Sequence, residues 1–258
     1  MADALEKWME AIEEVERVLN PVREMLARAL EPGSELRTLA SAWPRIAERF
    51  TSLSQVVRDA CERAALPPFR LMDIDEWSAI EQASKHGGID AAADAVARLS
   101  REALESPENR AELLRDWRKN RIAATRADVL EQALKAHELG LFAVSIPPFL
   151  AHLEGVIADA KHAPDARKNP KFDELKRYVS ELADGDEYMG RIISEYVSDT
   201  VYQSFVRNTD APPFSRHAIL HGFDTRYATA MNSVRAILTF DCVQDLVLEH
   251  QKALEDGG

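Results

Sequence analysis

Apolar residues recur in steps of three and four along most of this chain, which is the spacing of one face of an α-helix. Between Asp3 and Leu30 these positions are Leu5, Trp8, Ile12, Val15, Val18, Leu19, Val22, Met25 and Leu26. Only 10 glycines occur in 258 residues, so the turn residues that separate short β-strands are scarce. Ala, Leu, Glu and Arg, which favour helix, are abundant. The sequence therefore predicts an all-α protein.

Prolines and glycines set the expected ends of the helices. We expect helices over residues 3–30 with an interruption at Pro21, 35–49 after a cap at Ser34, 52–64, 75–88, 89–104, 109–137, 147–162, 172–182, 187–207 and 225–254. Ser106 and Pro107 are typical of a helix cap followed by a first-turn proline. Gly140 is expected to end a helix, and Pro147-Pro148 to open the next. The break near Pro107 is the best domain boundary, dividing an N-terminal helical region (1–106) of undefined role from a C-terminal domain (107–258).

Charge and cysteine content exclude several classes of function. The net charge is -12, and non-specific nucleic-acid binding relies on phosphate neutralisation by Lys and Arg. Any nucleic-acid site must therefore be a local basic one or come from a partner, and binding to an anionic membrane surface is disfavoured. Cys61 and Cys242 lack metal-ligand spacing and are typical of reduced core residues in a cytosolic protein. The N-terminus has no signal-peptide pattern and no apolar stretch is of membrane-spanning length, which predicts a cytoplasmic protein.

The segment from Pro213 to Phe240 carries the residues most suited to chemistry. Arg216, His217 and His221 lie within six residues of one another. A guanidinium stabilises negative charge and an imidazole moves protons near neutral pH, so the two together suit a phosphodiester substrate. The alternative is structural: His221 directly before Gly222 fits a histidine in the last turn of a helix that glycine ends.

Glu154 falls on the edge of an apolar stripe in the helix expected after Pro148. The stripe consists of Phe149, Leu150, Leu153 and Ile157. Glu154 follows Leu150 by four residues and precedes Ile157 by three, so it projects toward the same face. A carboxylate there needs a partner, most simply an arginine, and Arg216 is one candidate. The alternative is that Glu154 reaches water at the margin of the stripe.

Tyr227, the arginines between Arg110 and Arg126, and the remaining histidines are weaker candidates for a functional role. Tyr227 could stack on a base, or pack at the start of a helix near Asn232. The arginines between Arg110 and Arg126 could guide RNA, or form a solvated helix face with the interleaved acids. The remaining histidines form no ligand set, so no metal or other cofactor is expected.

Two segments resemble the HEPN superfamily, in particular HEPN proteins of prokaryotic abortive-infection and toxin systems. The first segment is Arg-His-Ala-Ile-Leu-His-Gly, in which four residues separate Arg216 from His221. It is followed by Tyr227-Ala-Thr and by Asn232-Ser233, which lead into an apolar helix. The second, Gly140 to Gly155 with its final Glu-Gly pair, resembles the first helix of that domain. The resemblance covers roughly residues 120–256. Ser215 departs from it, since close relatives often have asparagine before the arginine.

The resemblance implies a four- or five-helix bundle that often dimerises through the motif-bearing helices, and metal-independent RNA cleavage in active members. Arg216 would then stabilise the charged transition state, and His221 would act as general base or acid. His217 would orient the site or contact RNA. The implied function is an endoribonuclease effector of a defence or toxin–antitoxin system, whose partners are RNA, a second copy of the chain and an antitoxin or other defence protein. The alternative is a non-catalytic helical interaction module in which Arg216 and Glu154 form a buried structural pair. A His221 that faces the core with its ring nitrogens satisfied internally would rule out the enzyme, and an open groove lined by Arg216 and His221 near a two-fold axis would favour it.

Overall fold

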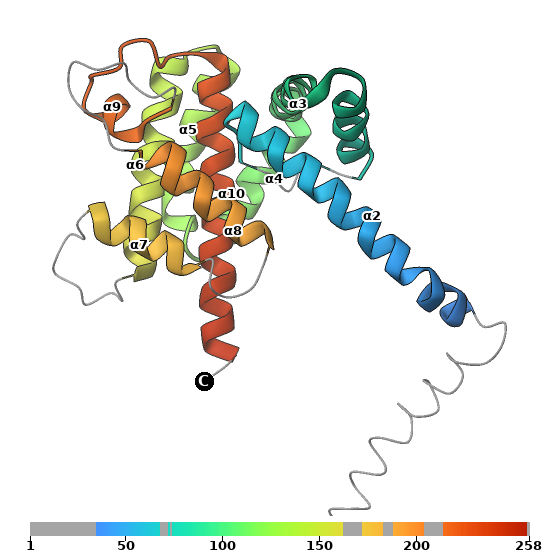
Figure 1. Ribbon diagram of the computed structural model, residues 1–258. Helices are drawn as coiled ribbons and strands as arrows, with labels where there is room; N and C mark the ends of the chain where they lie inside the picture. Colours follow the sequence, from blue (N-terminus) through green and yellow to red (C-terminus); the bar gives the residue numbers. More distant parts are fainter. Residues whose placement is uncertain are drawn as a thin grey trace, which may run out of the picture. The chain divides into compact units, whose positions relative to one another are not determined.

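The computed structural model describes residues 35–67, 72, 74–161, 172–182, 188–203 and 214–256, and within them every regular element is a helix (Figure 1). The elements are α2 (Glu35–Ala64), α3 (Ile74–Glu105), α4 (Pro107–Lys119), the 3-10 turn η1 (Ala124–Arg126), α5 (Ala127–Glu138), α6 (Phe142–Lys161), α7 (Phe172–Leu182), α8 (Tyr188–Tyr196), the π-helical turn η3 (Val197–Val201), α9 (Arg216–Leu220) and α10 (Ala230–Asp256). The expected all-α class is confirmed for this part of the chain. The helix expected over residues 3–30, with Pro21 and the Ser34 cap, lies outside it.

The chain divides into two compact units, Met1–Ser52 and Leu53–Gly258. Helix α2 contributes residues to both, and its last three turns, from Leu53 on, belong to the second unit. The second unit begins well before Pro107, the boundary expected from the sequence, and one buried apolar cluster extends from Val57 to Val247. All of the sites described below lie in this second unit.

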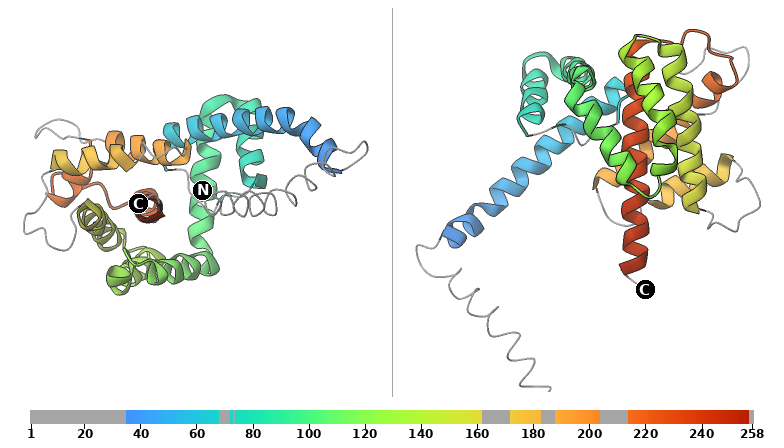
Figure 2. Two further views of the ribbon diagram at one scale, coloured as in Figure 1. Left: turned by 90° about the horizontal axis from the view of Figure 1, so that it is seen from below. Right: turned by 180° about the vertical axis from the view of Figure 1, so that it is seen from behind.

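Helix α10 is the central element of the second unit, with α6 packed along it and α5 packed on α6 (Figures 1 and 2). Trp117 of α4, Phe149 of α6 and Phe240 of α10 meet at ring-centroid distances of 5.4–6.0 Å. All three rings are fully buried, and two of the three contacts are edge-to-face, an arrangement that favours aromatic packing. This aromatic cluster fixes α4 and α6 against α10.

Hydrogen bonds between buried or partly buried polar side chains join α4, α5 and α6 to α10. Trp117 Nε1 donates to Asp241 Oδ1 at 2.9 Å, and Asn120 Nδ2 donates to the side-chain oxygen of Gln244. At the other end of α10, Ser233 Oγ lies 2.7 Å from His137 Nδ1 and 2.9 Å from Ser145 Oγ. Buried polar groups must be paired in this way to avoid a desolvation penalty.

Several helix ends lie where the sequence predicts them. Ser106 caps α4, its Oγ accepting from Asn109 N–H, and Pro107 is the first helical residue. Gly140 follows α5 with φ of 73°, and Gly88 interrupts α3 with φ of 74°, both in the left-handed region that glycine tolerates. Helix α7 has the bounds expected for it.

One expected break and one expected continuous helix are wrong. Residues 35–64 form one helix rather than two. The single helix expected over residues 109–137 is two, α4 and α5. Asn120 ends α4 because its side-chain oxygen accepts from Ile122 N–H while its amide bonds to α10, a role that only the tertiary structure reveals.

Three expected helix limits are also corrected. Helix α6 begins at Phe142, so Pro147 and Pro148 lie inside it instead of opening it. Helix α10 begins at Ala230 rather than near Thr225, after Thr229 accepts a hydrogen bond from Asn232 N–H. The helix expected over 187–207 begins at Tyr188 but changes to π-helix from Val197 to Val201.

Cys61 and Cys242 are buried and form no disulfide bond, in agreement with their interpretation as core thiols. Among the described helices, none has the length and apolar character needed to cross a membrane.

Candidate functional site at helix α9

Helix α9 is a single turn that is held at both ends. At its start, Ser215 Oγ accepts from Ala218 N–H at 3.3 Å and donates to the carbonyl of Gln203. At its end, Gly222 N–H bonds to the Ile219 carbonyl and Phe223 N–H to the Ala218 carbonyl, while Gly222 has φ of 71°. This pair of bonds is the Schellman motif, which ends helices with a left-handed glycine. The expectation that Gly222 stops a helix is confirmed.

Burial determines which side chains of α9 face outward. Phe214, Ala218 and Ile219 are buried and anchor the turn to the core beside α6. His221, at the C-cap, is exposed, and His217, one turn earlier, is partly exposed. His221 therefore does not face the core, and within the described part of the chain neither imidazole makes a hydrogen bond through a ring nitrogen.

The two histidines form a small cluster of rings with Phe223. The rings of His217 and His221 have centroids 4.5 Å apart, as expected for residues four apart on a helix. Phe223 lies 6.1 Å from each and is stacked on His221 at an interplanar angle of 28°. Partial burial lowers the pKa of His217, and His221 and then Arg216 lower it further, so the neutral imidazole is favoured at His217.

Arg216 forms an ion pair with Glu154 of α6, the partner that the apolar stripe suggested. The side chain of Arg216 is 14% exposed and that of Glu154 34%, so the pair lies largely inside the surface. Burial lowers the pKa of Arg216 from its usual high value. The ion pair fixes the guanidinium one residue from His217 and holds α9 against α6.

Tyr227 supplies a hydrogen bond in place of one that Pro147 removes from α6. Proline lacks an N–H, so the Ala143 carbonyl, four residues earlier, has no helical donor. The hydroxyl of Tyr227 donates to that carbonyl at 3.0 Å. This contact replaces the hydrogen bond lost at Pro147, and it gives Tyr227 a structural role at the start of a helix.

Asn232 is also engaged in structure. Its Nδ2 donates to the Tyr227 carbonyl at 2.9 Å, and its Oδ1 accepts from Arg235 Nη1 at 2.8 Å. Arg235 donates further to the carbonyls of Ala64 and Ala65 at the end of α2. Asn232 is 6% exposed, so it orders the loop between α9 and α10 rather than offering a free amide to a ligand.

The arginines between Arg110 and Arg126 are mostly neutralised by acids from other helices. The ion pairs are Arg110–Glu138, Arg118–Glu131, Arg121–Glu255 and Arg126–Asp159. This pairing favours the interpretation as a solvated, salt-bridged face. Among the described residues no group of three His, Cys, Asp or Glu side chains is arranged to hold a metal ion.

The structure thus brings four of the six candidate residues together, on α9 and the facing turn of α6. They are Arg216, His217, His221 and Glu154. Tyr227 and Asn232 instead support the loop that follows. The sequence interpretation missed Phe223, although a hydrophobic residue directly after a C-terminal glycine is a known feature of the Schellman motif.

Comparison of the chain with models of known protein families, with curated proteins and with solved structures found no match.

Proposed function

We propose that the chain is a metal-independent endoribonuclease of the HEPN type, acting as an effector of a prokaryotic defence or toxin–antitoxin system. The observation that carries the proposal is the geometry of α9. One short helix presents two adjacent imidazoles, one of them exposed, beside a guanidinium whose position is fixed by Glu154. The resemblance of this segment and of α6 to HEPN proteins supplies the substrate class.

The chemistry requires one proton acceptor, one proton donor and a stabiliser of charge. One imidazole takes the proton of a ribose 2′-hydroxyl, and the resulting oxygen attacks the adjacent phosphorus. As the bond from phosphorus to the 5′ oxygen breaks, the second imidazole protonates that oxygen. A 2′,3′-cyclic phosphate and a 5′-hydroxyl end result. His217, whose pKa is lowered, suits the acceptor role, and His221 the donor role.

Arg216 would stabilise the negative charge on the phosphorane oxygens. Because Glu154 already holds the guanidinium, a phosphate must share Arg216 with this carboxylate or displace it. Glu154 is the more exposed of the two side chains, so it is the one that can move away. Two copies of α9 meeting at one cleft, as the resemblance implies, would double the positive charge there, and a solution mass of two chains would support this arrangement.

Cleavage of labelled single-stranded RNA in the presence of a chelator tests the proposal. The wild type is expected to cleave RNA and to leave the 2′-deoxy oligonucleotide of the same sequence intact. His221→Ala should lower the rate by about 100-fold or more, because it removes a proton-transfer group. His86→Ala is the matched control, since His86 is exposed on α3 and, among the described residues, its ring bonds to the Gln82 carbonyl alone.

The second candidate function, a non-catalytic interaction module, is favoured by a specific observation. Arg216 and Glu154 are paired and largely buried, and His221 is the C-cap of its helix. Under that alternative, the wild type and His221→Ala would show the same lack of cleavage. Equal rates in the two proteins would contradict the enzyme.

A further inference from the structure

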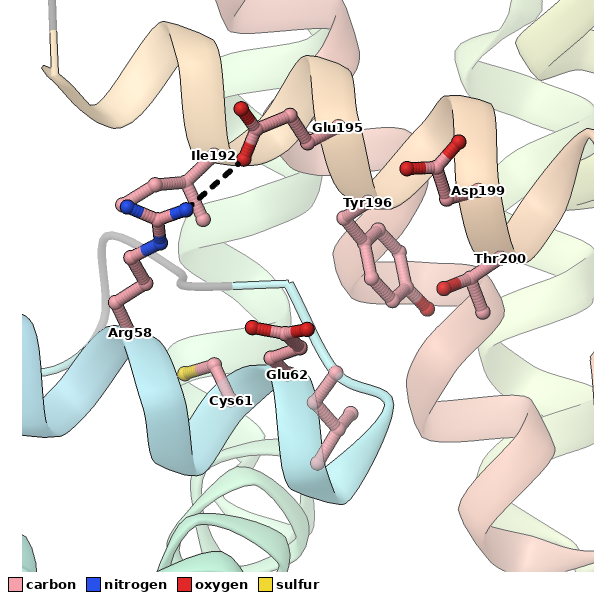
Figure 3. Close-up of a pocket in the computed structure, with 9 residues that line it drawn as sticks. Arg58, Cys61, Glu62, Ile192, Glu195, Tyr196, Asp199 and Thr200 are labelled. Carbon is pink, nitrogen blue, oxygen red and sulfur yellow. Dashed lines mark hydrogen bonds and ion pairs between the residues drawn. The ribbon is translucent and has the colours of Figure 1, made fainter.

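A small cavity lies between the end of α2 and the facing side of α8 and η3, away from helix α9 (Figure 3). Its volume is about 170 Å³. Arg58, Cys61 and Glu62 come from α2, and Ile192, Glu195, Tyr196, Asp199 and Thr200 come from the opposite wall. All of these residues belong to the second compact unit.

The inner part of the cavity is apolar and uncharged. Leu66, Ile192 and Tyr196 are at most 8% exposed, and the Tyr196 hydroxyl donates to the Ala65 carbonyl. Burial raises the pKa of the Cys61 thiol to about 12, so this side chain is neutral at physiological pH. The floor therefore suits the hydrocarbon part of a ligand.

The rim of the cavity carries an excess of negative charge. The lining includes three carboxylates, those of Glu62, Glu195 and Asp199, and one guanidinium, that of Arg58. Arg58 is paired with Glu195 at 3.3 Å, which neutralises both. Within the described part of the chain, the carboxylates of Glu62 and Asp199 have no partner. An anion would be repelled here, and a cation attracted.

Both walls of the cavity have unusual backbone geometry. Asp199 and Thr200 belong to η3, where Tyr202 N–H bonds to the Val197 carbonyl five residues earlier. Such π-helical turns occur frequently at functional sites. Directly before Leu66 of the other wall, Ala65 has φ of 50°, a strained conformation for alanine, and its carbonyl accepts from Arg235 and Tyr196. These two features are independent of the charge pattern and flank the same space.

We propose that this cavity binds a small aliphatic diamine, with one ammonium group beside Glu62, the other beside Asp199 on the opposite wall, and the hydrocarbon chain against Leu66, Ile192 and Tyr196. Size sets the limit, because a cavity of about 150 Å³ holds a molecule as large as benzene. A ligand of about six non-hydrogen atoms therefore fills the space. The proposal does not depend on ribonuclease activity, so the two can fail separately.

Calorimetric titration of the full chain with 1,4-diaminobutane tests the proposal. Binding is expected with a dissociation constant on the order of 0.1 to 1 mM, which is realistic for so small a ligand. Glu62→Gln and Asp199→Asn should each weaken binding by about tenfold, since each removes a charged hydrogen-bond acceptor. Neutral 1,4-butanediol, which has the same shape, should not bind.

Glu249→Gln separates a specific site from general attraction to an acidic protein, because Glu249 is exposed on α10 outside the cavity. This variant should bind the diamine as the wild type does. Absence of diamine binding by the wild type would overturn the proposal. So would equal affinity for butanediol, or an equal loss of affinity in Glu62→Gln and Glu249→Gln.

Discussion

At the scale of single residues, the ion pair between Arg216 and Glu154 illustrates how one contact can be both structural and functional. The guanidinium is mostly buried, while the carboxylate is about one-third exposed. Leaving a buried charge without its partner is costly, whereas exposed pairs contribute little. The contribution of this pair to stability can therefore be separated from any role in RNA binding by measuring folding alone.

A double-mutant cycle on this pair is expected to show coupling. Arg216→Ala and Glu154→Ala should each lower the free energy of unfolding by about 1 to 2 kcal/mol, and the double variant by about 1 kcal/mol less than their sum. The matched control is the exposed pair of Arg98 and Glu102 on α3, whose coupling should be below about 0.5 kcal/mol. Urea unfolding measures both cycles, and additive effects at Arg216 and Glu154 would contradict the pairing.

Tyr227→Phe is expected to lower the free energy of unfolding by about 0.5 to 1 kcal/mol, because the exposed Ala143 carbonyl then loses its protein donor and accepts from water instead. In a Pro147→Ala background the same change should cost less, since the N–H of the new alanine can bond to that carbonyl. Tyr178→Phe is the control, because the Tyr178 hydroxyl makes no hydrogen bond within the described residues. Equal costs in the two backgrounds would show that Tyr227 does not compensate for the proline.

At the scale of elements, α9 is too short to be stable by itself and depends on its caps. Isolated helices of a single turn do not form in water, because nucleation fixes several residues for one hydrogen bond. Ser215, the Schellman motif at Gly222 and the burial of Phe214 supply what the helix lacks. The relative positions of His217 and His221 therefore depend on the glycine that follows them.

Gly222→Ala should lower the free energy of unfolding by about 1 to 2 kcal/mol, because alanine at φ of 71° is strained. Gly222→Asn should cost less, since asparagine tolerates the left-handed conformation better. A steric clash is not the cause of this destabilisation, because a Cβ atom at position 222 would have no neighbouring atom within 4 Å. Thermal unfolding of the two variants checks the order, and equal stability of the alanine variant and the wild type would show that the turn can rearrange.

At the scale of the whole molecule, three histidines from different helices shift in the same direction. Burial is the main cause that lowers the pKa of His137, His152 and His217, with nearby arginines contributing to each. A histidine whose pKa is lower in the folded state binds fewer protons there than in the unfolded chain. Its contribution to stability is therefore present above the unfolded pKa of about 6.5 and is lost as the pH falls through the folded value.

The folded chain should consequently become less stable as the pH falls below about 6.5. His137→Gln should flatten this dependence, because the partly buried His137 is held against Ser233 by a hydrogen bond. His86→Gln, a change at an exposed site, should leave the dependence as it is in the wild type. Melting temperatures between about pH 5 and pH 8 provide the measurement, and identical slopes in all three proteins would contradict the assignment to His137.

Helix ends that depend on local residues could be predicted from the sequence, and those that depend on distant partners could not. Ser106, Gly140 and Gly222 cap the helical turns next to them in the sequence, so the helix ends at these residues agree with the prediction. Asn120 ends α4 partly through Gln244, which is 124 residues away, and Pro147 is tolerated through Tyr227. No local pattern contains these contacts.

The same distinction applies to the sites. The pairing of Glu154 with Arg216 was one of two alternatives, because an apolar stripe predicts a partner without identifying it. The amine cavity has no sequence signal, since its walls come from residues more than 100 positions apart and one wall requires a π-helical turn.

The hydrogen bond between Tyr227 and the Ala143 carbonyl has a consequence for how this sequence can change over time. The tyrosine supplies a protein donor in place of the one that the proline at 147 removes, so losing the tyrosine first leaves the Ala143 carbonyl with water as its donor. Losing the proline first is neutral in this respect, and it frees position 227 to vary. Related sequences should therefore contain the tyrosine without the proline more often than the proline without the tyrosine.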